Sequence, residues 1–293
     1  MLQIESAQNL AQNSSQTRGW HGQLQLDYAP VGSSTQLIQS QVRAPLKVQR
    51  PFYPEGETVC HSVILHTAGG IVGGDRLSLF LHLQPASQAL VTTAAAAKVY
   101  RSNGQEAIQQ VTAEIGPGAC LEWLPQDTIV FEQARYRQQM RIELAPGATW
   151  VGWDITRFGR SARGERFLAG DWRSHTEVWQ AGKPLWLDRQ WLPGSTELFH
   201  SPHGLAGCPV VGSFALLGQA VEPDLVAQAR SLWQGAPGIS GVTRLQSGLL
   251  ARYRGDSTVE ARQWFLALWD LLRPVYAQRP ACIPRVWQIG QSC

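Results

Sequence analysis

Short stretches of alternating apolar and polar residues follow one another from residue 19 to about residue 192. A period of two is typical of strands that bury one face, because successive side chains point to opposite sides of a sheet. The clearest case is 77–83, in which every second residue is leucine. Turn residues, mostly Gly and Pro, separate these stretches at intervals of roughly ten residues. The pattern predicts strands at 23–28, 59–65, 77–83, 89–101, 108–115, 119–124, 128–132, 136–144, 150–155, 177–180 and 184–191.

The apolar pattern changes to a helical period after Pro209. Apolar residues then recur every three to four positions, which predicts a helix at about 222–235 that ends at Gly235. A Ser-x-x-Glu capping box introduces a second apolar stripe, which predicts a helix at about 257–274. Pro274 is expected to end or kink this second helix, because proline lacks the N–H group that a helix interior needs.

These elements predict a mainly β fold class, with stacked short strands in a β-sandwich or in solenoid-like sheets and two α-helices near the C-terminus. Two helices are too few to act as crossovers over many strands, so a parallel βαβ sheet is not expected. Residues 19–293 are expected to form one domain that is β-rich to about residue 215. Residues 1–18 are rich in Gln, Asn and Ser, which predicts a flexible tail.

The chain is poor in charge, and its small basic excess lies in one segment. Charged residues make up 16% of the chain, against about 25% in a typical soluble protein, so the surface should repel partners only weakly. The net charge is +3, and residues 132–173 carry all of it, with eight Arg and five acidic residues. Nucleic-acid-binding domains usually combine denser basic clusters with a pI above about 9, whereas the pI here is about 8.7. Nucleic acid is therefore not an expected partner.

The apolar stretches and the cysteines both bear on the compartment. No apolar stretch reaches the roughly 18 residues that a membrane-spanning helix needs, so no membrane partner is expected. The five cysteines are odd in number and widely spread, and no Cys-x-x-Cys pair occurs. This usage favours a reducing compartment over a disulfide framework. We therefore expect a cytoplasmic protein.

The densest glycine cluster follows a predicted strand and comprises Gly69, Gly70, Gly73 and Gly74. Its spacing matches a phosphate-binding loop, but Asp75 stands where that loop needs lysine, and a strand follows instead of a helix. A carboxylate at that place would repel phosphate. We interpret the cluster as a double turn that needs positive φ angles or a close approach of the backbone.

Candidate catalytic groups are few. Glu122 and Asp127 flank a short turn, and paired carboxylates are suited to acid–base chemistry. His200 and His203 stand three positions apart in a predicted loop and could contribute to a metal site. One hypothesis is therefore a metal-assisted hydrolase that uses these four residues. The chain has no recognisable nucleophile motif, which favours a binding or scaffold role instead.

Several stretches match motifs of one known family. They are RPFYPEG within 48–56, HTAGGIVGGD at 66–75, TTAAAAKVYRS at 92–102, LEWLPQDTI at 121–129, GRSARGE at 159–165, and RP with PRVW in 279–287. In this order, and over about residues 20–290, they resemble the blocks of the urease accessory protein UreD (UreH) family. Three departures alter local geometry: Thr67-Ala68 replaces a Pro-Pro pair, alanines at 94–97 replace a Pro-Gly-Ala-Thr run, and Asp127 replaces Glu.

The resemblance implies a non-catalytic chaperone of nickel insertion, which acts in metallocentre assembly for urease and so in nitrogen metabolism. Family members form a complex with UreF, which recruits the GTPase UreG, and they contact apo-urease. Their fold is a β-rich stack of sheets with two helices. No permanently bound cofactor is implied, but nickel is expected in transit along a water-filled path. The motif residues expected to be structural are Gly69, Gly70, Gly73, Gly74, Asp75, Tyr100, Arg101, Ser102, Trp123, Pro125 and Gln126.

Four acids inside the matching blocks are candidates to line such a nickel path: Asp75, Glu122, Asp127 and Glu165. A protein that passes nickel on should hold it weakly, through scattered carboxylates and water rather than a closed cage of His and Cys. Turn capping or pairing with Arg explains the same four acids equally well. Both interpretations are open at this point.

Overall fold

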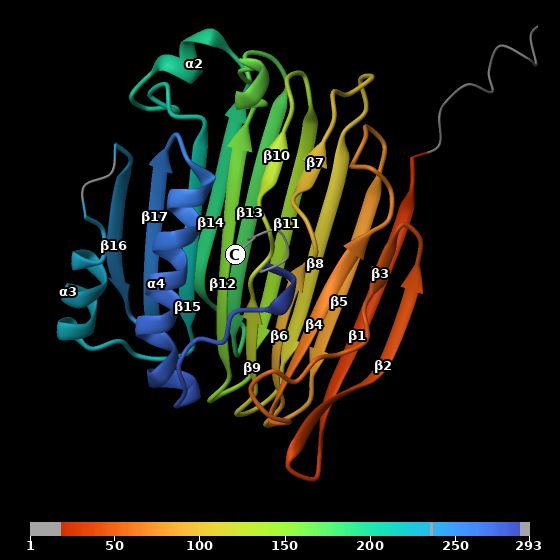
Figure 1. Ribbon diagram of the computed structural model, residues 1–293, viewed down its shortest axis with the longest axis vertical. Coiled ribbons are helices and arrows are strands. Elements are labelled where there is room, and N and C mark those ends of the chain that lie inside the picture. The colour runs from red at the N-terminus through yellow and green to blue at the C-terminus, as the bar shows by residue number, and fades with distance from the viewer. Residues whose placement is uncertain (1–18, 235–236, 288–293) are drawn as a thin grey trace, which may run out of the picture.

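The computed structural model describes residues 19–234 and 237–287 (Figure 1). The predicted tail at 1–18 and the predicted helix end at Gly235 lie outside the described residues. No helix in the described part is both long and apolar enough to cross a membrane. The elements, in chain order, are β1 (His21–Val31), β2 (Ser34–Arg43), β3 (Leu46–Val48), β4 (Val59–His66), β5 (Arg76–Leu83), β6 (Gln88–Thr93), β7 (Ala97–Val99), β8 (Ala107–Ile115), β9 (Cys120–Trp123), β10 (Thr128–Val130), β11 (Arg135–Leu144), β12 (Thr149–Phe158), η1 (Ser161–Arg163), β13 (Asp171–Gln180), β14 (Lys183–Pro193), α2 (Thr196–His200), β15 (Val210–Leu217), α3 (Pro223–Ser231), β16 (Ile239–Leu245), β17 (Gly248–Gly255), α4 (Thr258–Ala277) and η2 (Arg285–Trp287).

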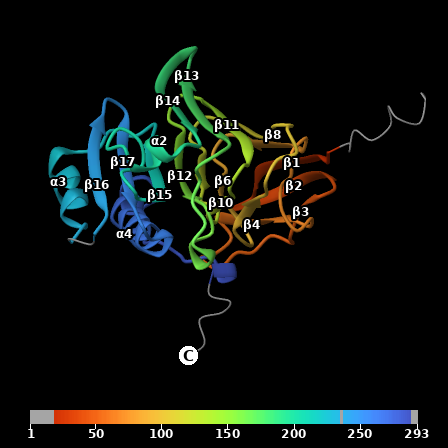
Figure 2. The same ribbon diagram turned by 90° about the horizontal axis from the view of Figure 1, so that it is seen from above.

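The strands form two stacked sheets, which are seen from above in Figure 2. The seven-stranded sheet has the order β14-β13-β11-β8-β5-β1-β2. The ten-stranded sheet has the order β16-β17-β15-β12-β9-β6-β4-β3, and the short strands β10 and β7 extend it from β12. The predicted mainly β fold class is confirmed.

From β4 to β13 the chain winds as a coil that lays strands in the two sheets alternately. β4, β6, β9 and β12 lie in the ten-stranded sheet, whereas β5, β8, β11 and β13 lie in the seven-stranded sheet. Strands of consecutive turns pair in parallel, as β5 does with β8 and β8 with β11. The parallel pairing therefore arises from a coil rather than from helical crossovers, which confirms the solenoid-like prediction.

The space between the sheets holds a shared apolar core. In β5 the alternation predicted at 77–83 buries every second leucine, with Leu79 4% and Leu81 2% exposed. The parallel register then places Leu79 beside Val111 and Leu81 beside Ala113 of β8. Each fully buried leucine contributes about 1.5–3 kcal/mol through the hydrophobic effect, so this repeated alternation stabilises the stack turn by turn.

Helices α3 and α4 cover the outer face of the ten-stranded sheet (Figure 2). There Phe265 and Trp269 of α4 pack on Trp153 of β12 and form a second apolar core. The two predicted helices are confirmed, but α4 continues past Pro274 to Ala277. Proline removes one helical hydrogen bond, and the side chain of Tyr276 holds the last turn by donating a hydrogen bond to Glu122.

Other boundaries differ from the predictions for physical reasons. The strand predicted at 89–101 is two strands, because β6 pairs with β4 and β9 whereas β7 pairs with β10. Strand β15 was missed since its run VVGSFALL is apolar on both faces and has no period of two. Strand β2 was missed since it is an exposed edge strand whose residues are mostly polar. The short helix α2 was not predicted.

The glycine-rich segment between β4 and β5 is a tight turn, as predicted. Gly74 has a φ angle of 93°, which side chains with a Cβ rarely adopt. A Cβ on Gly73 would lie only 2.7 Å from the main-chain oxygen of Gln105, so this glycine permits close approach of the backbone. Both predicted reasons for glycine therefore operate in this turn.

We predict that Gly74→Val lowers the free energy of unfolding by about 1–3 kcal/mol, because the branched side chain must adopt the positive φ angle. Gly69→Val is the matched control, since a Cβ at Gly69 would meet no atom within 4 Å. Chemical denaturation measures both variants. Equal stability of the two variants would contradict this explanation of the turn.

Candidate functional site

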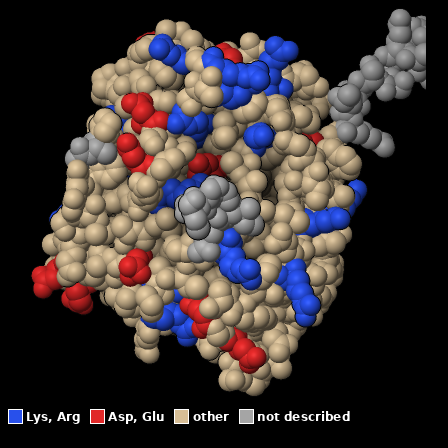
Figure 3. All heavy atoms as spheres, in the orientation of Figure 1, with Lys and Arg blue, Asp and Glu red and all other residues tan. Residues whose placement is uncertain are grey.

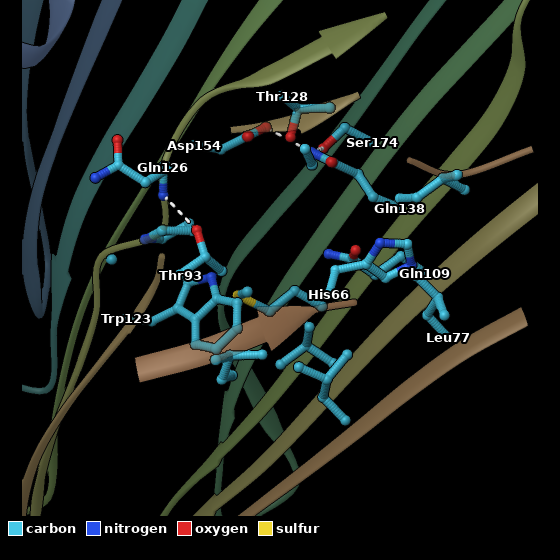
Figure 4. A pocket seen from close by; sticks show the side chains of 18 of the residues that line it. His66, Leu77, Thr93, Gln109, Trp123, Gln126, Thr128, Gln138, Asp154 and Ser174 are labelled. Atoms are coloured by element: carbon cyan, nitrogen blue, oxygen red, sulfur yellow. Dashed lines mark hydrogen bonds between the residues drawn. The ribbon is translucent and has the colours of Figure 1, made fainter. Parts of the chain in front are cut away.

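A cavity of about 540 Å³ lies between the two sheets (Figure 4). Its walls come from both sheets, from the turn around Gly69 and from the segment 93–98. At about 30 Å³ per liquid water molecule, such a space has room for a small ion that keeps several bound waters. The interior of this sandwich is therefore hollow where a purely structural core would be filled.

One row of polar side chains crosses the inner face of the seven-stranded sheet at the cavity. Its members are opposite one another in register on β8, β11, β13 and β14. They are Gln109, Gln138, Ser174 and Gln190. Each occupies an inward position of its strand, as Gln138 does between Tyr136 and Met140. The register of the strands thus aligns these polar residues, each of which stands at an otherwise apolar position of its strand, in one continuous polar row.

The ten-stranded sheet faces this row with polar residues of its own. Asp154 on β12 is opposite Ser213 on β15, and Ser213 is opposite Arg252 on β17. Gln138 Nε2 donates hydrogen bonds across the cavity to Asp154 Oδ2 at 2.5 Å and, within its own sheet, to Ser174 Oγ at 2.9 Å (Figure 4). Asp188, which also lines the cavity, is paired with Arg252, whose Nη2 lies 2.7 Å from Asp188 Oδ1.

Asp154 is the carboxylate with the most altered acidity in this cavity. Burial away from water raises the pKa of Asp154 to about 6, and the nearby negative charge of Asp188 raises it as well. The hydrogen bond from Gln138 acts in the opposite direction but does not outweigh burial. Asp154 therefore changes its charge close to neutral pH, so the charge inside the cavity depends on pH.

His66 connects the glycine-rich turn to the cavity that it lines (Figure 4). His66 Nδ1 lies 3.1 Å from the carbonyl oxygen of Ala68. A carbonyl oxygen can only accept a hydrogen bond, so Nδ1 carries the proton and Nε2 keeps its lone pair in the neutral ring. Nε2 is buried and has no hydrogen-bond partner among the described residues.

The four acids predicted for a nickel path are spread over the structure and engaged in other contacts. Asp75 caps the glycine turn by accepting hydrogen bonds from the main-chain N–H groups of Trp20 and Val72. Asp127 pairs with Arg262, and Glu165 pairs with Arg160. None of these three, nor Glu122, is among the described residues that line the cavity. Their contacts fit turn capping and pairing with Arg, while a role in nickel transit stays a prediction.

Glu122 belongs to a buried charged network that ties α4 to the ten-stranded sheet. Arg273 of α4 is fully buried, and its Nε and Nη2 atoms each lie 3.0 Å from a Glu122 carboxylate oxygen. The same guanidinium donates two hydrogen bonds to Glu55, at 2.7 and 2.8 Å. Burial alone would raise the pKa of Glu55, but hydrogen bonds from His61 and Arg273 lower it to about 2. Glu55 and Glu122, which lie far apart in the sequence, therefore both bind Arg273.

Of the remaining motif residues, three line the cavity and three lie in the loop after β7. Trp123, Pro125 and Gln126 line the cavity, and Pro125 accepts a hydrogen bond from Trp153 Nε1 at 2.8 Å. Tyr100 donates a hydrogen bond to the carbonyl oxygen of Gly69 at 3.0 Å. Arg101 and Ser102 follow Tyr100 in the loop after β7 and do not line the cavity described above.

The hydrolase hypothesis has no metal centre within the described residues. In residues 19–234 and 237–287, no group of three or more His, Cys, Asp or Glu side chains could hold a metal ion. Glu122 and Asp127 are both paired with arginines of α4, whereas His200 ends α2 and His203 lies in the following loop. The four residues are therefore not brought together as one site.

The sequence analysis missed the polar residues of the cavity, above all Gln138, Asp154 and Asp188. Two signals pointed to them: each interrupts the apolar side of an alternating strand, and each stands one or two positions from a tryptophan, tyrosine or methionine. A single such interruption is common in edge strands. Only the register across several strands shows that the interruptions form one row.

Comparison with known proteins gives a consistent result over nearly the whole chain. The family model described as "UreD urease accessory protein" matches residues 21–288. A protein of Nostoc punctiforme named "Urease accessory protein UreD" is 64% identical over 94% of this chain and 99% of its own. Proteins of the same name from Trichormus variabilis and Dechloromonas aromatica are 62% and 42% identical, over 95% and 92% of this chain and 100% and 94% of their own lengths.

We predict that Glu122→Ala lowers the free energy of unfolding by about 3–5 kcal/mol, because it removes one of the two carboxylates that neutralise the buried Arg273. Glu114→Ala is the control, since the side chain of Glu114 is exposed and makes no hydrogen bond or ion pair with any described residue. Thermal and chemical denaturation measure the difference. A fully stable Glu122→Ala protein that fails to activate urease would instead support the nickel-path interpretation of Glu122.

Proposed function

The chain belongs to the UreD family of urease accessory proteins, and from this premise we propose that it binds apo-urease together with UreF and UreG and helps to deliver nickel to the urease active site. In this proposal the protein is an accessory protein and not an enzyme, and nickel is its cargo rather than a resident cofactor. The observation that carries the proposal is the row of polar side chains, facing Asp154, that crosses the otherwise largely apolar cavity between the two sheets.

The cavity supports passage of an ion because polar side chains occupy its walls from both sides. Burial of a polar group costs folding free energy unless the group is hydrogen-bonded. A row of Gln and Ser that faces Asp154 would therefore destabilise a purely structural core. The same groups could replace part of the water shell of a divalent ion. Delivery through this interior would spare nickel the desolvation that an apolar core would impose.

The donor set supports weak and exchangeable binding rather than storage. Asp154 and Asp188 supply carboxylate oxygens from different sheets, while Gln138 and Ser213 supply neutral oxygens. Arg252 neutralises part of the charge of Asp188, which lowers its attraction for a cation. Nickel held by few ligands of this kind would leave readily, as a delivery protein requires.

We predict that Asp154→Asn lowers the fraction of urease activated by this protein with UreF and UreG by about tenfold or more, while the complex still assembles. The substitution removes one negative charge from the cavity but keeps the size of the side chain and its hydrogen bond with Gln138. Nickel content of urease and its activity are measured beside co-purification of UreF and urease.

Asp224→Asn is the matched control for this experiment, because Asp224 is exposed in the first turn of α3, away from the cavity-lining residues. Full activation by Asp154→Asn and by the double variant Asp154→Asn/Asp188→Asn would reject the cavity as the nickel path. Loss of the complex in Asp154→Asn alone would show that Asp154 serves assembly instead.

A second prediction concerns stability and pH. The folded-state pKa of Asp154 is raised from 3.8 to about 6, so between these values the folded protein keeps a proton that the unfolded chain has lost. Stability should therefore fall as pH rises from about 4 to about 6, by roughly 2–3 kcal/mol through this group. In Asp154→Asn this component should vanish. If the free energy of unfolding depends on pH in the same way in both proteins across this range, the raised pKa does not belong to Asp154.

A further inference from the structure

Three exposed arginines at one end of the molecule have no acidic partner. The side chains of Arg101 and Arg163 make no hydrogen bond or ion pair with any described residue. Arg166 contacts only the ring of Phe199, with the guanidinium 5.5 Å from the ring centroid. Arg141 and Arg189 are exposed but paired with glutamates. Arg43 and Arg50 are exposed and also have no ion pair with a described residue, so what distinguishes the three arginines is that they gather at one end. These three guanidinium groups therefore keep their donors free for another molecule.

The strand arrangement explains why these arginines gather. β7, β10 and β12 are neighbours that run in parallel, so the loops that follow them emerge at the same edge of the ten-stranded sheet. Those loops carry Arg101, Glu132 and the segment Gly159–Arg166 respectively. Figure 3 shows Lys and Arg side chains gathered at this upper end, over the loops that follow β7, β10 and β12. We call this region, defined by Arg101, Arg160, Arg163 and Arg166, the basic end surface.

A shallow hollow of about 390 Å³ lies within the basic end surface. Its lining residues are Tyr100, Arg101, Phe131, Glu132, Gln133, Arg160 and Glu165. The two glutamates are already engaged: Glu132 accepts a hydrogen bond from the main-chain N–H of Leu168, and Glu165 accepts bonds from Arg160 and from the N–H of Glu132. Arg160 also stacks on Phe131 at 4.5 Å. The hollow itself carries two arginines and two glutamates, so the positive excess of the basic end surface comes from Arg163 and Arg166, which do not line the hollow.

We propose that the basic end surface binds an acidic segment of a protein partner during urease assembly, with its carboxylates paired to Arg101, Arg163 and Arg166. This inference rests on the proposed function, because its partner is one of the proteins of that assembly. Guanidinium groups bind carboxylates through two parallel hydrogen bonds, which gives such a contact direction as well as strength. Arginine is also enriched in protein interfaces relative to the rest of a surface.

The neighbourhood of the arginines favours a protein over a nucleic acid. Val72 and Leu168 are exposed beside them, at 42% and 37%, and offer apolar contacts to a folded partner. Single-stranded nucleic acid is usually held by bases that stack on exposed aromatic rings. Phe131, the phenylalanine of the hollow, is only 8% exposed and is covered by Arg160.

The test compares two triple variants with the same change in charge. The first is Arg101→Glu/Arg163→Glu/Arg166→Glu. The control is Arg43→Glu/Arg50→Glu/Lys183→Glu, which alters exposed cations on β2, between β3 and β4 and at the start of β14 that likewise make no ion pair with a described residue. Circular dichroism and melting temperature confirm that both variants are folded, as expected for exposed side chains without partners.

The dissociation constants of each protein for purified UreF and for purified apo-urease are measured at ionic strengths of about 0.05 and about 0.3 M, which shortens the screening length by a factor of about 2.5. For one of these partners we expect wild-type affinity to weaken with salt, the first variant to bind at least tenfold more weakly at low salt, and its salt dependence to flatten. The control should stay within about twofold of wild type. Wild-type affinity of the first variant for both partners would overturn the inference.

A labelled single-stranded DNA of 20 nucleotides and a labelled decapeptide of glutamate serve as probes of the surface itself, because a basic patch of either kind responds to salt. Preferential binding of the DNA, lost only in the first variant, would overturn the inference in favour of a nucleic-acid site. The inference and the proposed function fail in different ways. If the first variant still activates urease as wild type does, only the inference fails, whereas a wild-type protein that neither binds urease nor supports its activation rejects both.

Discussion

The parallel register between successive turns of the coil is the constraint on which the other features depend. It aligns residues that are register partners in straight rows across each sheet. One polar residue on each of four strands therefore forms a polar row from Gln109 to Gln190. It also brings the loops after β7, β10 and β12 to one edge, where their arginines gather. The cavity and the basic end surface are thus two results of one geometry, one along the inner face and one at the strand ends.

The network around Arg273 shows how the helical part is fixed to that coil. Glu55 precedes β4 and Glu122 lies on β9, yet both pair with one arginine of α4. A buried charge is tolerated only when its partners are in place, so α4 must lie where Arg273 reaches both carboxylates. The contacts of the acids in the most family-like stretches hold turns and helices in position, whereas the carboxylates that line the cavity, Asp154 and Asp188, stand outside those stretches.

Much of the fold could be predicted from local pattern, and the site could not. Alternation identified most strands, the capping box identified the start of α4, and glycine clustering identified the turn at Gly74, because each depends on residues close in sequence. Asp154, Asp188 and Gln138 meet only because β11, β12 and β14 are brought together by winding. Such residues look like isolated interruptions of an apolar pattern, and their common role depends on distant pairing. Two of the three arginines, Arg163 and Arg166, lie in the segment 132–173 that carries the excess of charge, but their gathering with Arg101 at one edge required the strand order.

A coil of this kind has a modular length. Strands in a sheet are spaced about 4.8 Å apart, so the polar row from Gln109 to Gln190, which crosses three strand spacings, extends for roughly 14 Å. Gaining or losing one turn would change that distance by one strand spacing without redesigning either end, since each turn contacts mainly its neighbours. The length of the polar row through the interior is therefore set by the number of turns of the coil. Insertion or deletion of a whole turn could change this length while the edges of the sheets stay as they are.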